Sequence, residues 1–292
     1  MDNNRRFPLI LSGFWLKIIA LITMTFDHIG FIIGDTGIGL VFRYIGRLSL
    51  PLFCFLIAEG AIHTKSFKKY ALRLGIMASA ISIAIIGDEL LHITGGMLRI
   101  EGNIFIDLLL GAVAIYCLRQ NKWYLKLLAI LPILFSVYTF IGSALEWCGC
   151  HGHILWCPYF LRGQYNWFAV LMIVLFYVAH YFTKLFIKYQ SGLTGIEEEA
   201  YKDSNIERHA LNIFSFLMVI VINVTFFIVG ILMPAQYVSW MIEVQLFSIV
   251  SGALLLLYNG RRGYNKKWFQ YGSYLYYPVH MIAIYLISML FI

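Results

Sequence analysis

Three ionisable side chains stand in an otherwise apolar segment near the start of the chain: Lys17, Asp27 and His28 in FWLKIIALITMTFDHIGFIIG. On an α-helix, Lys17 and His28 would project from nearly the same face, about 16 Å apart along the axis. Asp27 could pair with an arginine, or it could orient the His28 ring and stabilise its imidazolium. Ionisable groups at membrane depth are costly. We therefore interpret Asp27 and His28 as a candidate proton-transfer pair rather than a purely structural one.

Two further pairs stand in the segment FRYIGRLSLPLFCFLIAEGAIH. Arg43 and Arg47 are one helical turn apart near its start, and Glu59 and His63 are one turn apart near its end. Charged groups inside an apolar segment are functional candidates by default. For Arg43, Glu59 and His63, structural pairing or snorkelling toward the membrane surface stays open as an alternative.

Polar residues also occur in two later apolar segments. Asp107 follows shortly after Asn103, and His280 lies in YGSYLYYPVHMIAIY with Tyr277 three residues before it. His280 could act as a second base or a proton relay. It could instead bond a backbone carbonyl group that the kink at Pro278 leaves free.

The composition predicts a membrane protein. Of 292 residues, 61% are hydrophobic and 13% are charged, whereas soluble domains carry about 25% charged residues. Apolar runs separated by loop signals predict an all-α, polytopic transmembrane helical bundle with about nine spans, within a range of about 8–11. The expected boundaries are 14–34, 41–63, 70–87, 103–118, 123–142, 166–187, 209–232, 237–258 and 268–290.

Basic residues occur in every second loop, which is the pattern of cytoplasmic loops. The N-terminus is therefore expected in the cytoplasm. This topology also accounts for the net charge of +7, so no nucleic-acid partner is expected. The basic residues of these loops and of the N-terminus are Arg5, Arg6, Lys65, Lys68, Lys69, Arg73, Arg119, Lys122, Lys126, Lys184, Lys188, Lys202, Arg208, Arg261, Arg262, Lys266 and Lys267.

Residues 1–292 are expected to form one integral membrane domain, because no internal repeat or second soluble domain is visible. Two of its loops are longer than the others. One is an extracytoplasmic loop at about 143–165, and the other is a cytoplasmic loop at about 189–208 that carries both signs of charge.

The extracytoplasmic loop is rich in potential metal ligands: Cys148, Cys150, Cys157, His151 and His153. Mixed cysteine and histidine clusters can bind zinc, but the Cys-x-Cys spacing here is tighter than usual. An oxidising compartment favours a disulfide instead. A disulfide, a metal site and free thiols all stay open. We favour the disulfide and expect no metal.

Several motifs, taken in order, resemble the TraX family of integral membrane proteins. They are LKIIALITMTFDHIG, FRYIGRLSLPLFCFLIAEGAIHTKSFKKYALRLG, NIFIDLLLG, LLLLYNGRRG and YLYYPVHMIAIYLI. The resemblance covers roughly the first 115 residues and roughly the last 40, whereas about 143–208 carries no signal of the family. The family is associated with N-terminal acetylation of conjugative pilin and is grouped with the transmembrane acyltransferases.

The resemblance implies an enzyme of the bacterial plasma membrane that moves an acetyl or other acyl group from cytoplasmic acetyl-CoA to an acceptor at the outer face. The acceptor would be an amine or hydroxyl, as in a pilin or peptide N-terminus or a cell-surface glycan. His28 would be the catalytic histidine, and Lys17 would contact the acyl donor. The wider group has arginine where this chain has Lys17, and lysine cannot make the bidentate phosphate contact of arginine.

These roles can be extended to the other candidates. Asp27 would orient the His28 ring, and Arg43, Arg47 or Tyr277 would stabilise the developing oxyanion. A pantetheine arm of roughly 15–20 Å would span the distance from the inner face to His28. The residues expected to contact the donor are Lys17, Arg43, Arg47, Glu59 and His63.

Two other functions stay open. A transporter or flippase could use the same buried charges as a substrate or proton pathway. A scaffold in a membrane assembly machine would need none of them. The lipid bilayer is an expected partner in each case, and a homodimer is compatible with the aromatic-rich helices.

Overall fold

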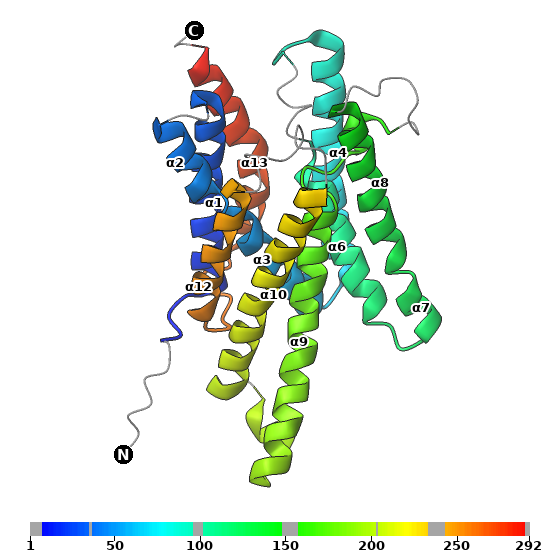
Figure 1. Cartoon of the computed structure of the whole chain (residues 1–292), viewed down its shortest axis with the longest axis vertical. Helices are drawn as coiled ribbons and strands as arrows, with labels where there is room; N and C mark the ends of the chain where they lie inside the picture. The colour runs from blue at the N-terminus through cyan, green and yellow to red at the C-terminus, as the bar shows by residue number, and fades with distance from the viewer. Residues whose placement is uncertain are drawn as a thin grey trace. The chain divides into compact units, whose positions relative to one another are not determined.

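The computed structural model consists of α-helices and short 3₁₀ turns (Figure 1). The structure describes residues 8–34, 37–95, 102–147, 157–202, 204–232 and 243–289. Over these residues there is no β-strand, and one isolated bridge joins Leu11 to Tyr258. The all-α prediction is therefore confirmed.

Six helical segments are long and apolar enough to cross a membrane. Four of them are single helices: α1 (Gly13–Ile33), α4 (Phe67–Leu91), α9 (Trp167–Thr194) and α10 (Asn205–Leu232). The segment Gly37–His63 contains α2 (Gly37–Gly46) and α3 (Ser49–His63). The segment Trp123–Leu145 contains α7 (Trp123–Leu127) and most of α8 (Ile130–Trp147). Ile104–Leu118 (α6) and Glu243–Leu256 are shorter apolar helices, and the latter contains η3 (Phe247–Val250) and α12 (Ser251–Leu256). The remaining elements are η1 (Tyr159–Leu161), η2 (Glu198–Tyr201) and α13 (Lys267–Ser288). The chain is thus a helical membrane protein, while nine spans and a cytoplasmic N-terminus stay predictions.

The second predicted span is two helices rather than one. A turn at Arg47 and Leu48 separates α2 from α3. Pro51 accounts for the break, because it has no N–H to donate to the carbonyl group of Arg47 one turn earlier. Proline is tolerated in the first turn of α3, where the N–H groups have no partner within the helix.

Two other boundaries differ from the prediction. The third span was expected to be short at 70–87, but α4 has 25 residues. α9 continues to Thr194, into the loop expected at about 189–208, and α10 begins at Asn205. The residues between α9 and α10 include the 3₁₀ turn η2. By contrast, α6 is short, with 15 residues, as expected.

The contacts of the chain divide it into two compact units. Unit 1 comprises Met1–Leu56, Leu175–Thr225 and Glu243–Tyr276. Unit 2 comprises Ile57–Val174, Phe226–Ile242 and Tyr277–Ile292. Each unit is described by itself below.

In unit 1, α1 packs closely on α2 (Figure 1). A Cβ atom at Gly30 would lie 2.6 Å from the carbonyl oxygen of Gly39, so only glycine permits this approach. The rings of Phe26 and Phe42 pack beside it, with their centroids 5.0 Å apart. Tyr276 of α13 bonds α1 through its hydroxyl, which lies 2.7 Å from Thr25 Oγ1. These contacts position the C-terminal half of α1.

In unit 2, α4 packs on α6. Asn103 joins the two helices, because its Oδ1 caps α6 by accepting from Phe105 N and its Nδ2 donates to the carbonyl oxygen of Ala78 at 2.8 Å. At the other end of the pair, Phe67 and Tyr116 stack with centroids 4.2 Å apart. The start of α4 therefore lies beside the end of α6, and the basic loops that adjoin them share one end of unit 2.

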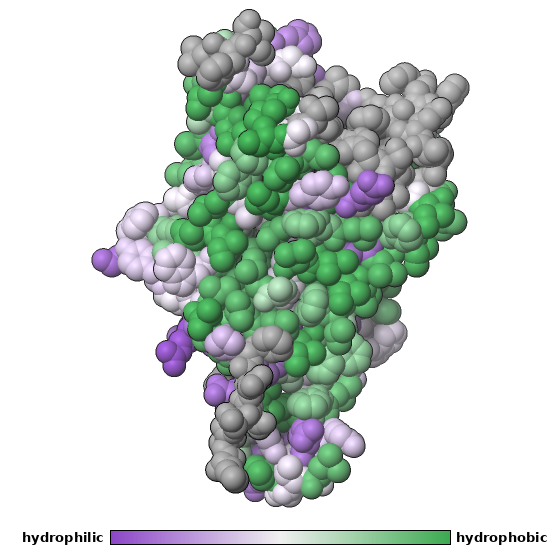
Figure 2. All heavy atoms as spheres, turned by 60° about the vertical axis from the view of Figure 1, so that its left-hand side comes forward, coloured by the Kyte–Doolittle hydropathy of each residue, from purple (hydrophilic) through white to green (hydrophobic). Residues whose placement is uncertain are grey.

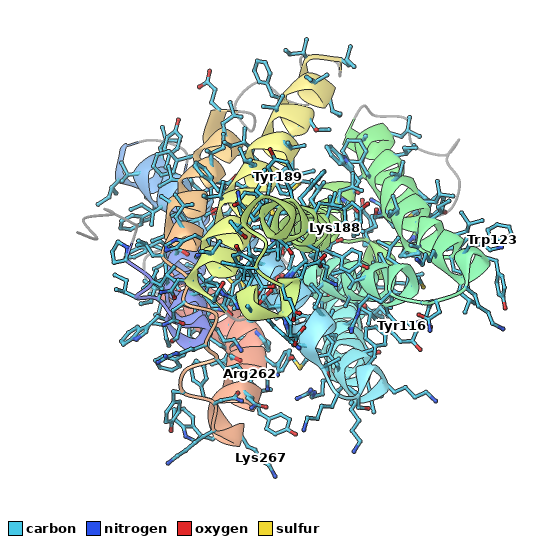
Figure 3. All side chains as sticks on the ribbon, turned by 90° about the horizontal axis from the view of Figure 1, so that it is seen from below. Tyr116, Trp123, Lys188, Tyr189, Arg262 and Lys267 are labelled. Atoms are coloured by element: carbon cyan, nitrogen blue, oxygen red, sulfur yellow. The ribbon has the colours of Figure 1, made fainter. Side chains whose placement is uncertain are left out.

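The surface fits a lipid environment. Hydrophobic side chains cover most of the face drawn in Figure 2, and large apolar residues such as Ile83 and Leu90 are strongly exposed. Soluble monomers rarely expose contiguous apolar surface of this kind. Aromatic and basic side chains, which favour the membrane–water interface, occur near helix ends in both units. Those labelled in Figure 3 are Tyr116, Trp123, Lys188, Tyr189, Arg262 and Lys267.

Candidate functional site

Asp27 lies at the centre of a buried ion-pair cluster in unit 1. Its Oδ1 accepts a hydrogen bond from Arg47 Nη2 and lies 3.3 Å from Arg43 Nη1. The three side chains are each 10% exposed or less. Asp27 therefore pairs with both arginines, and the described cluster contains two guanidinium groups and one carboxylate.

Gly46 lets Arg43 of α2 and Arg47 of the following turn reach Asp27 of α1. A Cβ atom at Gly46 would lie 2.2 Å from the Cβ of Asp27 and 2.5 Å from its Oδ1. Arg47 follows this glycine directly, in the turn before α3, and its Nε donates to the carbonyl oxygen of Arg43 at 3.4 Å. The helical spacing of the two arginines and the missing side chain between them thus create the cluster.

The His28 ring is held by the backbone of its own helix. The ring is buried, and Nδ1 lies 2.9 Å from the carbonyl oxygen of Met24. Because a carbonyl oxygen only accepts, Nδ1 carries the proton, and in the neutral ring Nε2 carries the lone pair. Of the two roles expected for Asp27, pairing with arginine is the one that the structure shows. The carbonyl oxygen of Met24, and not the Asp27 carboxylate, bonds Nδ1 of the ring.

Lys17 lies on the same unbroken helix as His28, since α1 runs from Gly13 to Ile33. The two Cα atoms are therefore about 16 Å apart along the axis. Lys17 Nζ lies 5.7 Å from the ring centroid of Phe269, in cation–π geometry. The expected arrangement of a cation and an imidazole along one helix is present.

The cluster also includes Gln245, which was not predicted from the sequence. Gln245 Oε1 accepts a hydrogen bond from Arg47 Nη1 at 3.3 Å, and the residue is 5% exposed. Its Nε2 has no acceptor among the residues that the structure describes. The only signal in the sequence is a glutamine within an apolar run, which is a weak one.

Tyr277 and His280 come together in unit 2. Their ring centroids are 5.7 Å apart, and both residues are buried. The Tyr277 hydroxyl donates to Gln164 Oε1 at 3.4 Å, and its ring and that of Phe105 form a T-shaped pair. Pro278 lies inside α13 between them. Tyr277, His280 and Gln164 thus form a second cluster of polar side chains that contains a buried histidine.

Asp107 anchors the loop that carries Gln164. The residue is fully buried, and its Oδ2 accepts from Tyr165 N at 2.8 Å. A Cβ atom at Gly163 would lie 1.8 Å from Asp107 Oδ1, so the loop backbone can approach the carboxylate only at a glycine. Arg162 O accepts from Asn103 N at 3.1 Å and ties down the same loop. Asp107 thus positions the loop and, through it, the partner of Tyr277.

Glu59 and His63 form a local pair at the end of α3. His63 Nδ1 lies 3.0 Å from the carbonyl oxygen of Glu59 and 4.0 Å from Oε2 of its carboxylate. The His63 side chain is 54% exposed, whereas that of Glu59 is 12% exposed. Both belong to unit 2, whereas Lys17, Arg43 and Arg47 belong to unit 1.

Several predicted groups lie outside the described residues. They are Arg5, Arg6, Cys148, Cys150, His151 and His153. Of the loop cysteines only Cys157 is described, and it is buried, with its Cβ 3.1 Å from the position of a Cβ at Gly142. The choice between a disulfide, a metal site and free thiols therefore stays a prediction.

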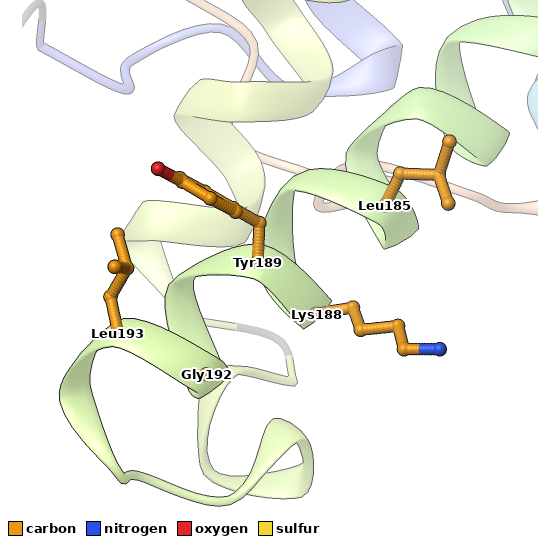
Figure 4. Close-up of a pocket in the computed structure, with 5 residues that line it drawn as sticks. All are labelled: Leu185, Lys188, Tyr189, Gly192 and Leu193. Atoms are coloured by element: carbon orange, nitrogen blue, oxygen red, sulfur yellow. The ribbon is translucent and has the colours of Figure 1, made fainter.

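A recess on α9 is lined by Leu185, Lys188, Tyr189, Gly192 and Leu193 (Figure 4). All of these residues lie on the single helix α9. Figure 4 shows the Lys188 side chain extending away from the Tyr189 ring. None of the candidate catalytic residues lines this recess, so we do not regard it as a candidate active site.

Comparisons with known proteins identify the family. A family model described as "TraX protein" matches residues 12–288. A relative named "Probable fimbrial assembly protein FimC, serogroup H1", from Dichelobacter nodosus, is 34% identical over 112 residues. That match covers 36% of this chain and 45% of the relative, which is less than half of its length. No solved structure gives a significant match. The family model matches nearly all residues of this chain, so the chain belongs to the TraX family.

Proposed function

We propose that this chain is a membrane acyltransferase of the bacterial plasma membrane. It moves an acetyl or other acyl group from cytoplasmic acetyl-CoA to an amine or hydroxyl acceptor at the outer face. The observation that carries this proposal is the position of His28, whose Nδ1 is held by Met24 O, directly after the aspartate of the buried arginine cluster. The link of the TraX family to pilin acetylation supports the same class of reaction.

His28 Nε2 acts as the general base in this proposal. It removes a proton from the acceptor amine or hydroxyl as that atom attacks the carbonyl carbon of the acyl thioester. The C–S bond then breaks, and the proton passes from His28 to the leaving thiolate. Arg43 and Arg47 lie in the adjoining cluster and stabilise the negative charge that develops on the carbonyl oxygen. Acetyl-CoA is a substrate of this reaction and supplies the activated acyl group.

Lys17 is proposed to contact the phosphate groups of the donor as a point charge. Its separation from His28, about 16 Å along α1, is comparable to the length of a pantetheine arm. Glu59 and His63 are proposed as further donor contacts. Tyr277 is proposed as a second stabiliser of the oxyanion, and His280 as a second base or relay.

A protein or peptide N-terminus is the acceptor that we favour. The D. nodosus relative is named for fimbrial assembly, and the TraX family is linked to pilin acetylation. A glycan hydroxyl is the second acceptor to test, because His28 would activate either nucleophile in the same way.

The proposal is tested with His28→Ala and His28→Gln in purified protein. Transfer of labelled acetyl from acetyl-CoA is measured with a pilin peptide and with a glycan as acceptors. Loss of a general base lowers turnover by about 10²–10⁴-fold, so both variants are expected to lose at least about 100-fold. His180→Ala is a matched control, since His180 also lies on a membrane helix of unit 1 but outside the cluster.

Folding is checked by thermal unfolding and gel filtration of each variant in detergent. Wild-type transfer by a folded His28→Ala variant would contradict the mechanism. Stabilisation of the wild-type chain by CoA would support a donor site. Substrate uptake into proteoliposomes without CoA dependence would instead favour a transporter.

A further inference from the structure

We infer that Gln245 is a further catalytic residue of this site, and that its side-chain N–H donates to the acyl oxygen as negative charge develops there. The group that Gln245 would bind is the negatively charged oxygen that forms on the carbonyl carbon of the acyl group during transfer. The inference rests on the acyltransferase function proposed above. It names a specific residue, which neither the family match nor the motifs in the sequence indicate.

The orientation of the amide group follows from its contact with Arg47. A guanidinium has only donors, so the oxygen of the amide must face Arg47, and Oε1 accepts from Nη1 at 3.3 Å. The NH₂ group is then left for another partner. It is buried and has no acceptor within the described part of the chain. Buried donors in native proteins are nearly always bonded, so this NH₂ marks a place for a ligand oxygen.

The surroundings of this NH₂ group favour an oxygen that carries negative charge. Arg43 and Arg47 supply two positively charged guanidinium groups to the cluster. In a buried site with little water, fixed donors and charges interact with an oxyanion far more strongly than they do in water. Arg47 contacts both Asp27 and Gln245, so Gln245 belongs to the same cluster as the two arginines.

His28, the proposed base, is the next residue in the chain after Asp27 of the cluster. Asp27 and His28 are consecutive residues of α1, so their Cα atoms are about 3.8 Å apart. The acceptor atom forms its bond to the carbonyl carbon while His28 takes its proton, and the electron pair of the C=O bond moves to the oxygen. Gln245 and Arg47 donate to that oxygen. When the C=O bond re-forms, the C–S bond breaks and the thiolate receives the proton.

Two substitutions separate a donor role from a purely positioning role. Gln245→Glu keeps an oxygen that accepts from Arg47 but removes both N–H donors, whereas Gln245→Leu removes both functions. If the N–H acts on the oxyanion, both variants lower kcat on the order of 100-fold. KM for acetyl-CoA is expected to change by less than about threefold in both, because the contact strengthens only in the transition state.

Gln270→Leu is the matched control, because Gln270 is a glutamine of unit 1 whose amide bonds Asn265 at the surface. It is expected to keep wild-type kcat. Wild-type kcat in Gln245→Glu would overturn the inference, because Gln245 would then serve only as an acceptor for Arg47. If that variant does not fold by thermal unfolding, wild-type kcat in Gln245→Leu would overturn it equally. These results leave the acyltransferase function intact, whereas a wild-type chain that transfers no acetyl group would overturn both.

Discussion

Two buried aspartates, Asp27 and Asp107, are stabilised in different ways. Asp27 in unit 1 is paired with two guanidinium groups, which come from α2 and the turn that follows it. Asp107 in unit 2 accepts from the backbone N–H of Tyr165 in a loop. Side-chain cations can also interact with a substrate, whereas a backbone N–H in a tied-down loop serves mainly to hold that loop in place.

The two aspartates are expected to serve different functions. The Asp27 cluster contains charged donors, and His28 follows Asp27 directly in the chain. In the proposed mechanism these donors would stabilise the charge that develops during the reaction. The Asp107 contacts hold the loop that carries Gln164 and thereby position the Tyr277 hydroxyl. We therefore expect charge to matter at position 27 and only the acceptor oxygen to matter at position 107.

The largest effect is expected from Asp27→Asn. The substitution removes the negative charge that lies between Arg43 and Arg47. Breaking a buried ion pair by removing one partner costs about 3–5 kcal/mol, so we expect a large fall in thermal stability in detergent and loss of acetyl transfer. An unchanged melting temperature would show that the arginines do not depend on Asp27.

An intermediate effect is expected from Gly46→Ala. The new Cβ would lie 2.2 Å from the Cβ of Asp27, so α2 must move away from α1. Overpacking of this kind costs about 1–3 kcal/mol. Gly75→Ala on α4 is the matched control, because a Cβ there meets nothing within 4 Å. Alanine within a helix is favoured over glycine by roughly 0.5–1 kcal/mol, so the control should be neutral or slightly more stable.

The smallest effect is expected from Asp107→Asn. Asparagine keeps an oxygen that can accept from Tyr165 N, so we expect a loss of only about 1 kcal/mol. Hydrogen exchange at the Tyr165 amide and thermal unfolding measure it. Asp107→Ala leaves that N–H without its acceptor and should expose the amide to faster exchange. A stability loss in Asp107→Asn as large as that in Asp27→Asn would contradict the contrast between the two units.

Much of the architecture could be predicted from the residues alone. Each predicted span contains a helix among the described residues, because hydrophobicity and helical periodicity are local properties. The break between α2 and α3 was missed, although Pro51 marks it. The length of α4 was underestimated, because polar and charged residues at both of its ends were assigned to the adjoining loops.

The candidate site was predictable only in part. The placement of Lys17 and His28 along one helix needs nothing beyond the period of an α-helix. The partner of each buried group was harder to predict. Asp27 had two expected roles, and packing of α2 through Gly46 brings the arginines to its carboxylate. His28 is held by a carbonyl oxygen one turn earlier, a bond that many helical side chains could make.

The sequence by itself determined that this protein is helical, belongs in a membrane, and carries a lysine and a histidine about three turns apart on its first long helix. Tertiary structure alone decided that Arg47 meets Gln245, which lies 198 positions away. The physical reason is that the apolar faces of these helices have similar hydropathy, so the hydropathy of the sequence does not show which face packs on which. Contacts between the few polar side chains therefore depend on which helices pack together, and at which glycines they approach.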